Sequence, residues 1–369
     1  MSSKETKGEH MLVHICCSVD SHYFLQKLQE DYPNERLIGF FYDPNIHPYS
    51  EYYLRLLDVK RSCEMLGIEL IEGEYDTDAW LELVQGLENS PEKGARCKVC
   101  FESRFEVSAQ KAVELGQKLF TSTLLTSPKK SLTQLASIGN AIATQHNIEF
   151  IAPNYRKASG TQEQNIMAKE AKLYRQSYCG CLYALRDQRA KQKMLMDELI
   201  SPISNETLPD SLEAKIALYE KRLDLEHEGR EYKIIKQRLL NYRLLYAYVK
   251  VKDETISSHF LPYSTIRGDH SRGKIEYEIE GIYYFNRDEV KFITLELYNL
   301  LAQTSYEKVN DLLYHPPTFE EEIAIRNQIS RTPYDLGAII VVDEIPTAKL
   351  EIVCQARTYS DVVEKLIEL

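Results

Sequence analysis

Short apolar runs alternate with helical stretches through the first 150 residues of this 369-residue chain, and this alternation constrains the fold more than any other feature. The apolar runs have the length of strands, and the segments between them have the 3.6-residue periodicity of helices. Because parallel strands need long crossover connections, the pattern predicts an α/β fold with a parallel sheet and helices on both faces. Such sheets carry their functional sites at the carboxyl ends of the strands.

The expected elements follow from runs of apolar residues and from helix-start and helix-stop residues. The expected strands are residues 11–16, 37–42, 68–71, 118–124 and 149–151. The expected helices are residues 21–32, 49–66, 76–87, 98–115, 131–146 and 182–199, with Asp76 opening the third of them. Residues 1–10 are polar and are expected to form a disordered tail.

Residues 201–211 are rich in Ser, Pro, Asn and Asp, which is typical of a linker. After them, the order of expected helices and strands no longer alternates regularly. We therefore expect a catalytic domain over 11–200 and a smaller accessory α+β domain of unknown role over 212–369. The expected helices of that domain are 212–245, 287–302 and 358–368, and its expected strands are 246–251, 274–285 and 338–344. It carries no motif that indicates chemistry.

The chain is acidic, with a net charge of -11, which argues against nucleic-acid binding by total charge. One short segment, residues 156–193, departs from this pattern, because it carries nine basic and three acidic side chains. This segment is either a solvated helix face or a patch that contacts phosphates.

We expect neither a secretory signal nor a membrane-spanning segment in this sequence. No apolar run reaches the roughly 18 residues that span a bilayer, and residues 1–10 lack the apolar core of a secretory signal. We therefore expect a cytoplasmic protein without a membrane partner. Thiols stay reduced in that compartment, so clustered cysteines there indicate metal ligands or redox groups.

Six of the eight cysteines form three short motifs. These motifs are Cys16-Cys17 at the end of the first strand, Cys97-x-x-Cys100 in a loop before a helix, and Cys179-x-Cys181 inside the basic segment. Of the other two, Cys63 lies in the middle of a helix and Cys354 in an apolar, strand-like run, and both are expected in the core. A structural zinc site would need only four cysteines, so an iron–sulfur cluster fits the surplus better.

Asp20 follows Cys17 by three residues and has two interpretations. It is a helix N-cap, or it is a carboxylate that faces the cluster as an iron ligand or proton donor. The surrounding CSVDS overlays imperfectly on the S-G-G-x-D-S loop of ATP pyrophosphatases, which wraps pyrophosphate with backbone N–H groups. Cys17 and Ser18 occupy the glycine positions, so the expected fold is HUP-like, or ATP-pyrophosphatase-like, with a degenerate nucleotide loop.

Over residues 11–190 the sequence resembles the QueH family of epoxyqueuosine reductases. The matching stretches are HICCSVDS (14–21), GFFYDPNIHPYSEY (39–52), RCKVCFESR (96–104), FTSTLLTSPKKS (120–131) and LYRQSYCGCLYALR (173–186). The resemblance implies the last step of queuosine biosynthesis, in which the epoxide of epoxyqueuosine at the tRNA wobble position is deoxygenated to an alkene. This oxidoreductase reaction consumes two electrons and two protons and releases water.

The resemblance also implies roles for the clustered residues. It implies that a 4Fe–4S cluster is bound by Cys16, Cys17, Cys97 and Cys100. Cys179 and Cys181 would be a redox-active dithiol, or they would join Asp20 around an additional mononuclear iron. The implied partners are a tRNA with a GUN anticodon that carries epoxyqueuosine, and a ferredoxin- or flavodoxin-like electron donor.

Six further residues of the basic segment could bind the substrate. Basic side chains could contact tRNA phosphates or face solvent, namely Arg156, Lys157, Lys169 and Arg175. Tyr174 and Tyr178 could stack on an extruded anticodon base or lie in the core.

Two rival functions remain open at this point. An iron–sulfur tRNA thiolase of the ATP-pyrophosphatase type would bind ATP, and the missing glycines argue against it. A zinc-stabilised RNA-binding module would be colourless and free of iron.

Overall fold

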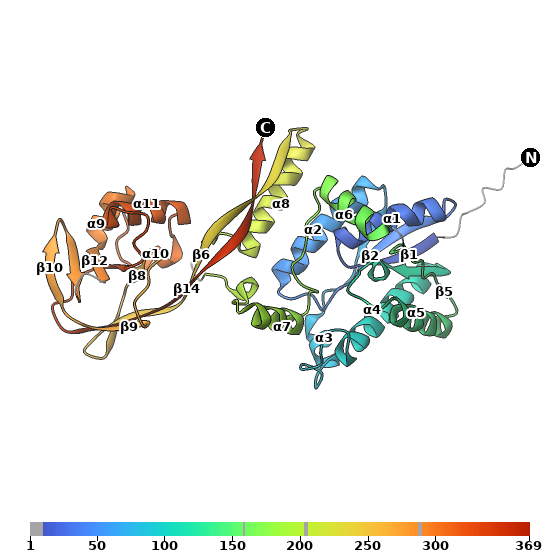
Figure 1. The fold of residues 1–369 in the computed structure, drawn as a ribbon, viewed down its shortest axis with the longest axis horizontal. Helices are drawn as coiled ribbons and strands as arrows, with labels where there is room; N and C mark the ends of the chain where they lie inside the picture. The colour runs from blue at the N-terminus through green and yellow to red at the C-terminus, as the bar shows by residue number, and fades with distance from the viewer. Residues whose placement is uncertain (1–9, 158, 203–205, 287–289) are drawn as a thin grey trace, which may run out of the picture. The chain divides into compact units, whose positions relative to one another are not determined.

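The computed structural model describes residues 10–157, 159–202, 206–286 and 290–369, and the chain forms two compact units (Figure 1). The first unit contains Met1–Leu199 and Tyr219–His227, and the second contains Ile200–Leu218 and Glu228–Leu369. Residues 1–9 of the expected disordered tail lie outside the described residues, and His10 begins the first strand.

The first unit contains the parallel sheet that the sequence predicts. Its strands, in spatial order, are β3 (Glu69–Glu72), β2 (Arg36–Phe41), β1 (His10–Ile15), β4 (Leu119–Ser122) and β5 (Glu149–Phe150). All neighbouring strands pair in parallel, and β1 lies between β2 and β4 with His14 opposite Phe40 and Ser122. The chain therefore reverses its direction of winding between β1 and β4, where open α/β sheets form their binding crevice.

Helices cover both faces of this sheet. They are α1 (Ser18–Asp31), α2 (Tyr49–Met65), α3 (Thr77–Leu83), α4 (Ala95–Glu114), α5 (Leu132–His146), α6 (Gly160–Glu170) and α7 (Leu182–Gln192), with the 3₁₀ turns η1 (Thr123–Leu125) and η2 (Asp197–Leu199). Figure 1 shows α1, α2 and α6 on one side of the sheet and α4 and α5 on the other. As predicted, Asp76 caps α3 by accepting a hydrogen bond from the amide of Ala79 at 2.9 Å.

The core of the first unit lies on both sides of β1. Every residue from Met11 to Ile15 is fully buried, which explains why the strand is a continuous apolar run instead of an alternating one. Gly139 of α5 sits against the ring of Phe150, and a Cβ there would lie 2.3 Å from that ring. This glycine therefore sets how closely α5 packs on β5.

Three helices of the first unit differ from the expectation. The fourth begins at Ala95, so Cys97 and Cys100 lie within α4 and not in a preceding loop. The helix expected over 182–199 ends at Gln192, where Lys193 adopts a left-handed conformation. The helix α6 was not predicted, since its polar sequence has little apolar periodicity.

The second unit combines two sheets with helices. The five-stranded sheet contains β10 (Ile275–Ile279), β11 (Ile282–Phe285), β12 (Val290–Thr294), β13 (Ala338–Val342) and β8 (His259–Phe260). The four-stranded sheet contains β7 (Glu254–Ile256), β6 (Tyr232–Val251), β14 (Leu350–Glu368) and β9 (His270–Gly273). The helices are α9 (Leu295–Ala302), α10 (Asp311–Tyr314) and α11 (Phe319–Ser330), and α8 (Leu212–His227) begins in this unit.

Three helix predictions in this region were wrong over much of their length. The helix predicted over 212–245 stops at His227, and β6 begins at Tyr232. The helix predicted over 358–368 is the end of β14, which pairs with β6 along its whole length. In the third, over 287–302, residues 287–289 lie outside the described ones, and β12 precedes α9. Long-range strand pairing overrides local helix propensity in β6 and β14.

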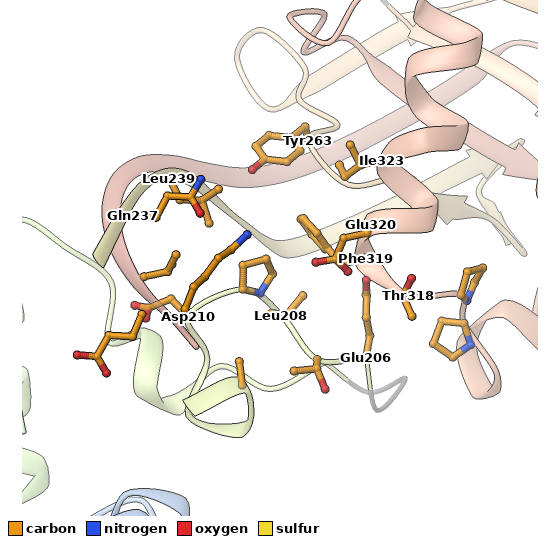
Figure 2. Close-up of a pocket in the computed structure, with 18 of the residues that line it drawn as sticks. Glu206, Leu208, Asp210, Gln237, Leu239, Tyr263, Thr318, Phe319, Glu320 and Ile323 are labelled. Atoms are coloured by element: carbon orange, nitrogen blue, oxygen red, sulfur yellow. The ribbon is translucent and has the colours of Figure 1, made fainter. Parts of the chain in front are cut away.

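The second unit contains a cavity of about 870 Å³ (Figure 2). Its wall comes from residues 206–210, β6 and α11, and includes Glu206, Leu239, Phe319 and Ile323. None of the site residues predicted from the sequence lines it. Within the described residues, no helix is both long enough and apolar enough to cross a membrane.

Candidate metal centre

The first cysteine pair lies where the winding of the sheet reverses. Cys16 follows β1 directly, and Cys17 is the N-cap residue of α1. Their sulfur atoms are 3.9 Å apart, and the Cys16 sulfur is 3.8 Å from the hydroxyl of Thr123 in η1, which follows β4. This is the crevice at the strand ends where the sequence predicts the site.

The second pair lies in the first two turns of α4. Cys97 and Cys100 are both buried. The backbone amide of Lys93 donates to the Cys97 sulfur at 3.3 Å. Cys100 belongs to the same apolar cluster as Cys181. The Cys97–Cys100 pair therefore lies next to the Cys179-x-Cys181 motif.

The third pair lies in a loop that α2 holds in place. The guanidinium of Arg55 donates to the carbonyls of Tyr178 and Cys179, both at 3.0 Å, and also pairs with Glu51 at 2.7 Å. Gly180 has a φ of +129°, and a Cβ there would lie 2.9 Å from Ile46. Only glycine therefore fits between the two cysteines.

Three helix N-termini meet at the six cysteines. Cys17 and Cys181 are the N-cap residues of α1 and α7, and Cys97 is in the first turn of α4. The Cys181 sulfur accepts a hydrogen bond from the amide of Ala184 at 3.4 Å. The positive ends of the helix dipoles favour thiolates or an anionic cluster at this point.

The surroundings of the thiols shift their pKa values in opposite directions. Burial raises the pKa of Cys97 and Cys100. Burial, with the nearby Cys179, raises the pKa of Cys181 to about 12. Burial also opposes ionisation of Cys179, but Lys130, Arg104 and Arg55 outweigh it and lower the pKa of that thiol. Cys179 is therefore the member of its pair that carries a negative charge most readily.

Asp20 lies beside the first cysteine pair. Ligand atoms of Cys16, Cys17 and Asp20 fall within 4.8 Å of one another, and no other such group of three occurs among the residues that the structure describes. Gln164 donates to the Asp20 carboxylate at 2.8 Å, and burial raises the pKa of Asp20. Cys17, not Asp20, occupies the N-cap position, so the helix-cap interpretation of Asp20 was wrong.

A cavity of about 250 Å³ opens beside these residues. Its wall includes Cys16, Asp20, Lys130 and Cys179. Gln176 also lines it and donates to the Cys17 sulfur at 3.0 Å. A substrate in the cavity could therefore reach thiols, the Asp20 carboxylate and the Lys130 ammonium group.

The four basic residues among the six predicted substrate contacts differ in their surroundings. The guanidinium of Arg156 donates to the backbone carbonyls of Leu124, Leu125 and Lys130 and holds the loop after β4. Lys157, Lys169 and Arg175 are exposed.

The two tyrosines among the six predicted contacts, Tyr174 and Tyr178, are buried. The hydroxyl of Tyr174 donates to Glu51 at 2.9 Å, and that of Tyr178 donates to the carbonyl of His47. Tyr178 also lines the cavity beside the cysteines, so its stacking on a base stays a prediction.

Several polar residues at the site were missed by sequence reasoning although all lie in the motifs quoted above or between them. They are Arg55, Arg104, Lys130, Gln164 and Gln176. A charged side chain soon after a strand end, such as Lys130 after β4, was the available signal. Arg104 forms a buried ion pair with Asp43, which follows β2.

Comparison with known proteins points to one family. The sequence model of the family "Epoxyqueuosine reductase QueH" matches residues 11–187. A Helicobacter pylori protein named epoxyqueuosine reductase QueH is 40% identical over 350 residues, which cover 90% of this chain and 94% of that protein. The protein of the same name from Thermotoga maritima is 33% identical over 49% of this chain and 93% of its own length. The similarity to the Helicobacter protein thus extends into the second unit.

Two solved structures show weaker similarity. The U34-tRNA thiolase NcsA from Methanococcus maripaludis, described with its [4Fe-4S] cluster, is 18% identical with a TM-score of 0.34, over 59% of this chain and 74% of that one. A predicted tRNA methyltransferase subunit from Methanocaldococcus jannaschii is 13% identical with a TM-score of 0.32, over 51% of this chain and 90% of that one.

Proposed function

Because this chain belongs to the epoxyqueuosine reductase QueH family, we propose that its six clustered cysteines carry out the reduction of epoxyqueuosine in tRNA. The chain is an oxidoreductase of tRNA modification that completes queuosine biosynthesis. The observation that carries the assignment of the site is the meeting of three cysteine pairs at three helix N-termini beside one cavity.

Four of the cysteines suit a 4Fe–4S cluster. Cys16, Cys17, Cys97 and Cys100 are buried free thiols, and such clusters take four cysteine ligands. N–H groups of Lys93 and Gln176 already donate to two of the four sulfurs, as groups that tune cluster potentials do. A bound cluster would supply electron transfer and Lewis acidity at the epoxide.

Cys179 and Cys181 act as a redox-active dithiol in this proposal. Oxidising two thiols to a disulfide releases two electrons and two protons, which the epoxide consumes as it becomes an alkene and water. The disulfide is then reduced by a ferredoxin- or flavodoxin-like donor. In the alternative, the pair binds an additional iron together with Asp20, which lines the same cavity as Cys179.

Asp20 lines the cavity and has two roles open to it. It donates a proton to the departing oxygen, or it binds an additional iron through its carboxylate. Gln164 fixes the orientation of the carboxylate in either case.

The tRNA substrate brings phosphates to the exposed residues Lys157, Lys169 and Arg175, and its anticodon is of the GUN type. Of these three, Arg175 also lines the cavity beside the cysteines, so we expect the wobble nucleotide to enter beside Arg175. Arg156 contributes indirectly by holding the loop that ends at Lys130.

The first unit is a HUP-like domain whose nucleotide loop has been converted to a metal site. The strand order β3-β2-β1-β4-β5 and the location of Cys17 and Ser18 after β1 support this assignment. The side chains of Cys17 and Ser18 are buried where a pyrophosphate would need glycines. We assign residues 11–200 to catalysis and 201–211 to a linker. The rest of the chain, 212–369, is an accessory domain except for Tyr219–His227 of α8, which belongs to the first unit.

Anaerobic purification tests the cofactor assignment. The protein should be brown, contain iron and sulfide, and show the charge-transfer absorption of thiolate-bound iron. A colourless protein that contains one zinc and no iron would support the zinc-stabilised module instead. Binding of ATP and incorporation of sulfur into tRNA would support the thiolase.

A further inference from the structure

Lys130 is a buried lysine whose ammonium group touches a site cysteine. Its Nζ donates to the Cys179 sulfur at 3.1 Å, and the side chain is 6% exposed. Its other ionic partner is the half-exposed Glu92 at 3.5 Å. An ammonium group enclosed in this way needs a nearby anion, and a thiolate at Cys179 provides it.

The loop that carries Lys130 is held rigidly. Arg156 donates to the carbonyl of Lys130 at 2.7 Å and to those of Leu124 and Leu125 in the same loop. Beneath the ammonium group lies the ring of Phe101, with its centroid 5.7 Å from Nζ. Arg156 and Phe101 therefore fix Lys130 against Cys179.

Cys179 and Cys181 have different surroundings although only Gly180 separates them. Cys181 caps α7 and packs in the apolar cluster with Trp80 and Cys100, where no lysine contacts it among the described residues. Charged or titratable groups that face Cys179 come from α2, α4, the loop after η1 and the start of α7, namely Arg55, Arg104, Cys97, Cys100, Lys130 and Cys181. Within the part of the chain that the structure describes, Lys130 alone among these groups forms a hydrogen bond with the Cys179 sulfur.

We propose that Lys130 is a positioning residue that selects Cys179, and not Cys181, as the reactive thiolate of the dithiol. This role rests on the proposed redox function of the pair. Cys179 starts each reduction as the anion, and Cys181 supplies its proton and its sulfur when the S–S bond forms. Two electrons, the Cys181 proton and one proton from solvent balance conversion of the epoxide to alkene and water.

Alkylation of the anaerobic, full-length holoenzyme with iodoacetamide tests this role without any turnover. Mass spectrometry of the peptide containing Cys179 and Cys181 gives the rate at each sulfur across a pH series. In the wild-type enzyme, Cys179 should react first and at lower pH. Lys130→Met should slow Cys179 alkylation about tenfold near neutral pH and move its profile to higher pH, because the thiolate loses its cation.

Three other variants sharpen the test. Lys130→Arg keeps the positive charge and should restore most of the Cys179 reactivity. Lys129→Met removes the neighbouring exposed lysine and should leave the profile unchanged. Glu92→Gln removes the carboxylate that shares the Lys130 ammonium and should speed Cys179 alkylation about twofold, as expected for a half-exposed ion pair.

The outcomes separate this role from the reductase function itself. Unchanged Cys179 alkylation in Lys130→Met, with wild-type iron content, overturns the role of Lys130 even if the enzyme reduces epoxyqueuosine. Preferred alkylation of Cys181 in the wild-type enzyme overturns it as well. If Lys130→Met fails to fold, slower alkylation in Glu92→Gln gives the contradicting result. An enzyme with the expected profile but no reductase activity would contradict the proposed function alone.

Discussion

At the scale of single residues, the surroundings of each cysteine separate the eight by role. Burial raises the pKa of Cys63 in α2 and of Cys354 in β14 to about 12. Both pack in hydrophobic clusters, as the sequence predicts for core residues. Cys179 is also enclosed, yet three cations lower its pKa. Burial alone therefore does not distinguish an inert thiol from a reactive one.

Removing one proposed cluster ligand should remove the cluster. Cys97→Ala should lose most of its iron and its visible absorption, because a thiolate ligand is missing. Cys354→Ala removes a buried cysteine of the second unit and should keep wild-type iron. Iron content and absorption spectra of the two variants provide the comparison, and full iron in Cys97→Ala would contradict the ligand assignment.

Cys179→Ser should separate the dithiol from the cluster. The serine cannot form a disulfide, so turnover should stop while much of the iron remains. Anaerobic turnover assays and iron determination on the same preparation measure both effects. A parallel loss of iron would instead make the Cys179–Cys181 pair a ligand motif.

At the scale of elements, the loop that carries Cys179 and Cys181 depends on one glycine. Gly180→Ala should displace the loop, because its φ is +129° and the new Cβ would lie 2.9 Å from Ile46 and 3.2 Å from Arg55. We expect a loss of about 1–3 kcal/mol in the free energy of unfolding, and a larger loss of activity.

Gly116→Ala is the matched control for that substitution. Gly116 also has a positive φ, but its Cβ would meet no atom within 4 Å. Thermal unfolding and turnover should therefore change less than in Gly180→Ala. Equal activity in the two variants would show that the conformation of the loop does not matter to the reaction.

The elements around β1 could be predicted from sequence, whereas β6 and β14 could not. Strands β1 and β2 are buried on both faces and are separated by a helix, so their signal is local. Strands β6 and β14 are half-exposed and pair over more than a hundred residues of separation. Their apolar residues do not alternate strictly, so only tertiary pairing decides between strand and helix.

The same distinction applies to the site. Spacing in the sequence indicates the three cysteine pairs, and the strand-end rule indicates where they meet. Gln164 and Gln176 reach the site through helix and loop geometry that has no local pattern in the sequence. The placement of Arg156 beneath a loop, instead of at the surface, likewise depends on tertiary structure.

At the scale of the whole molecule, the first unit is completed by residues that follow the linker segment. Arg222 of α8 donates to Asp58 at 2.7 Å, and both side chains are fully buried. Asp58 also accepts hydrogen bonds from Ser18, which follows Cys17, and from the amide of Tyr174. Arg61 pairs with Glu226 from the same helix at 2.7 Å.

Arg222→Ala should therefore destabilise the first unit. It leaves a buried carboxylate without its cation, which costs about 3 kcal/mol or more in the free energy of unfolding. Arg230→Ala removes an exposed arginine of the second unit and should change stability little. Denaturant unfolding of the full chain measures both, and equal midpoints would show that α8 does not contribute to the first unit.

The most direct test of the central claim is mass spectrometry of tRNA nucleosides from a strain that lacks this protein. Epoxyqueuosine should accumulate there, and the wild-type chain should restore queuosine. Complementation with Cys179→Ser should leave epoxyqueuosine in place. Normal queuosine in the deletion strain, with no other reductase present, would contradict the function of the chain, and restoration by Cys179→Ser would contradict the role of the dithiol.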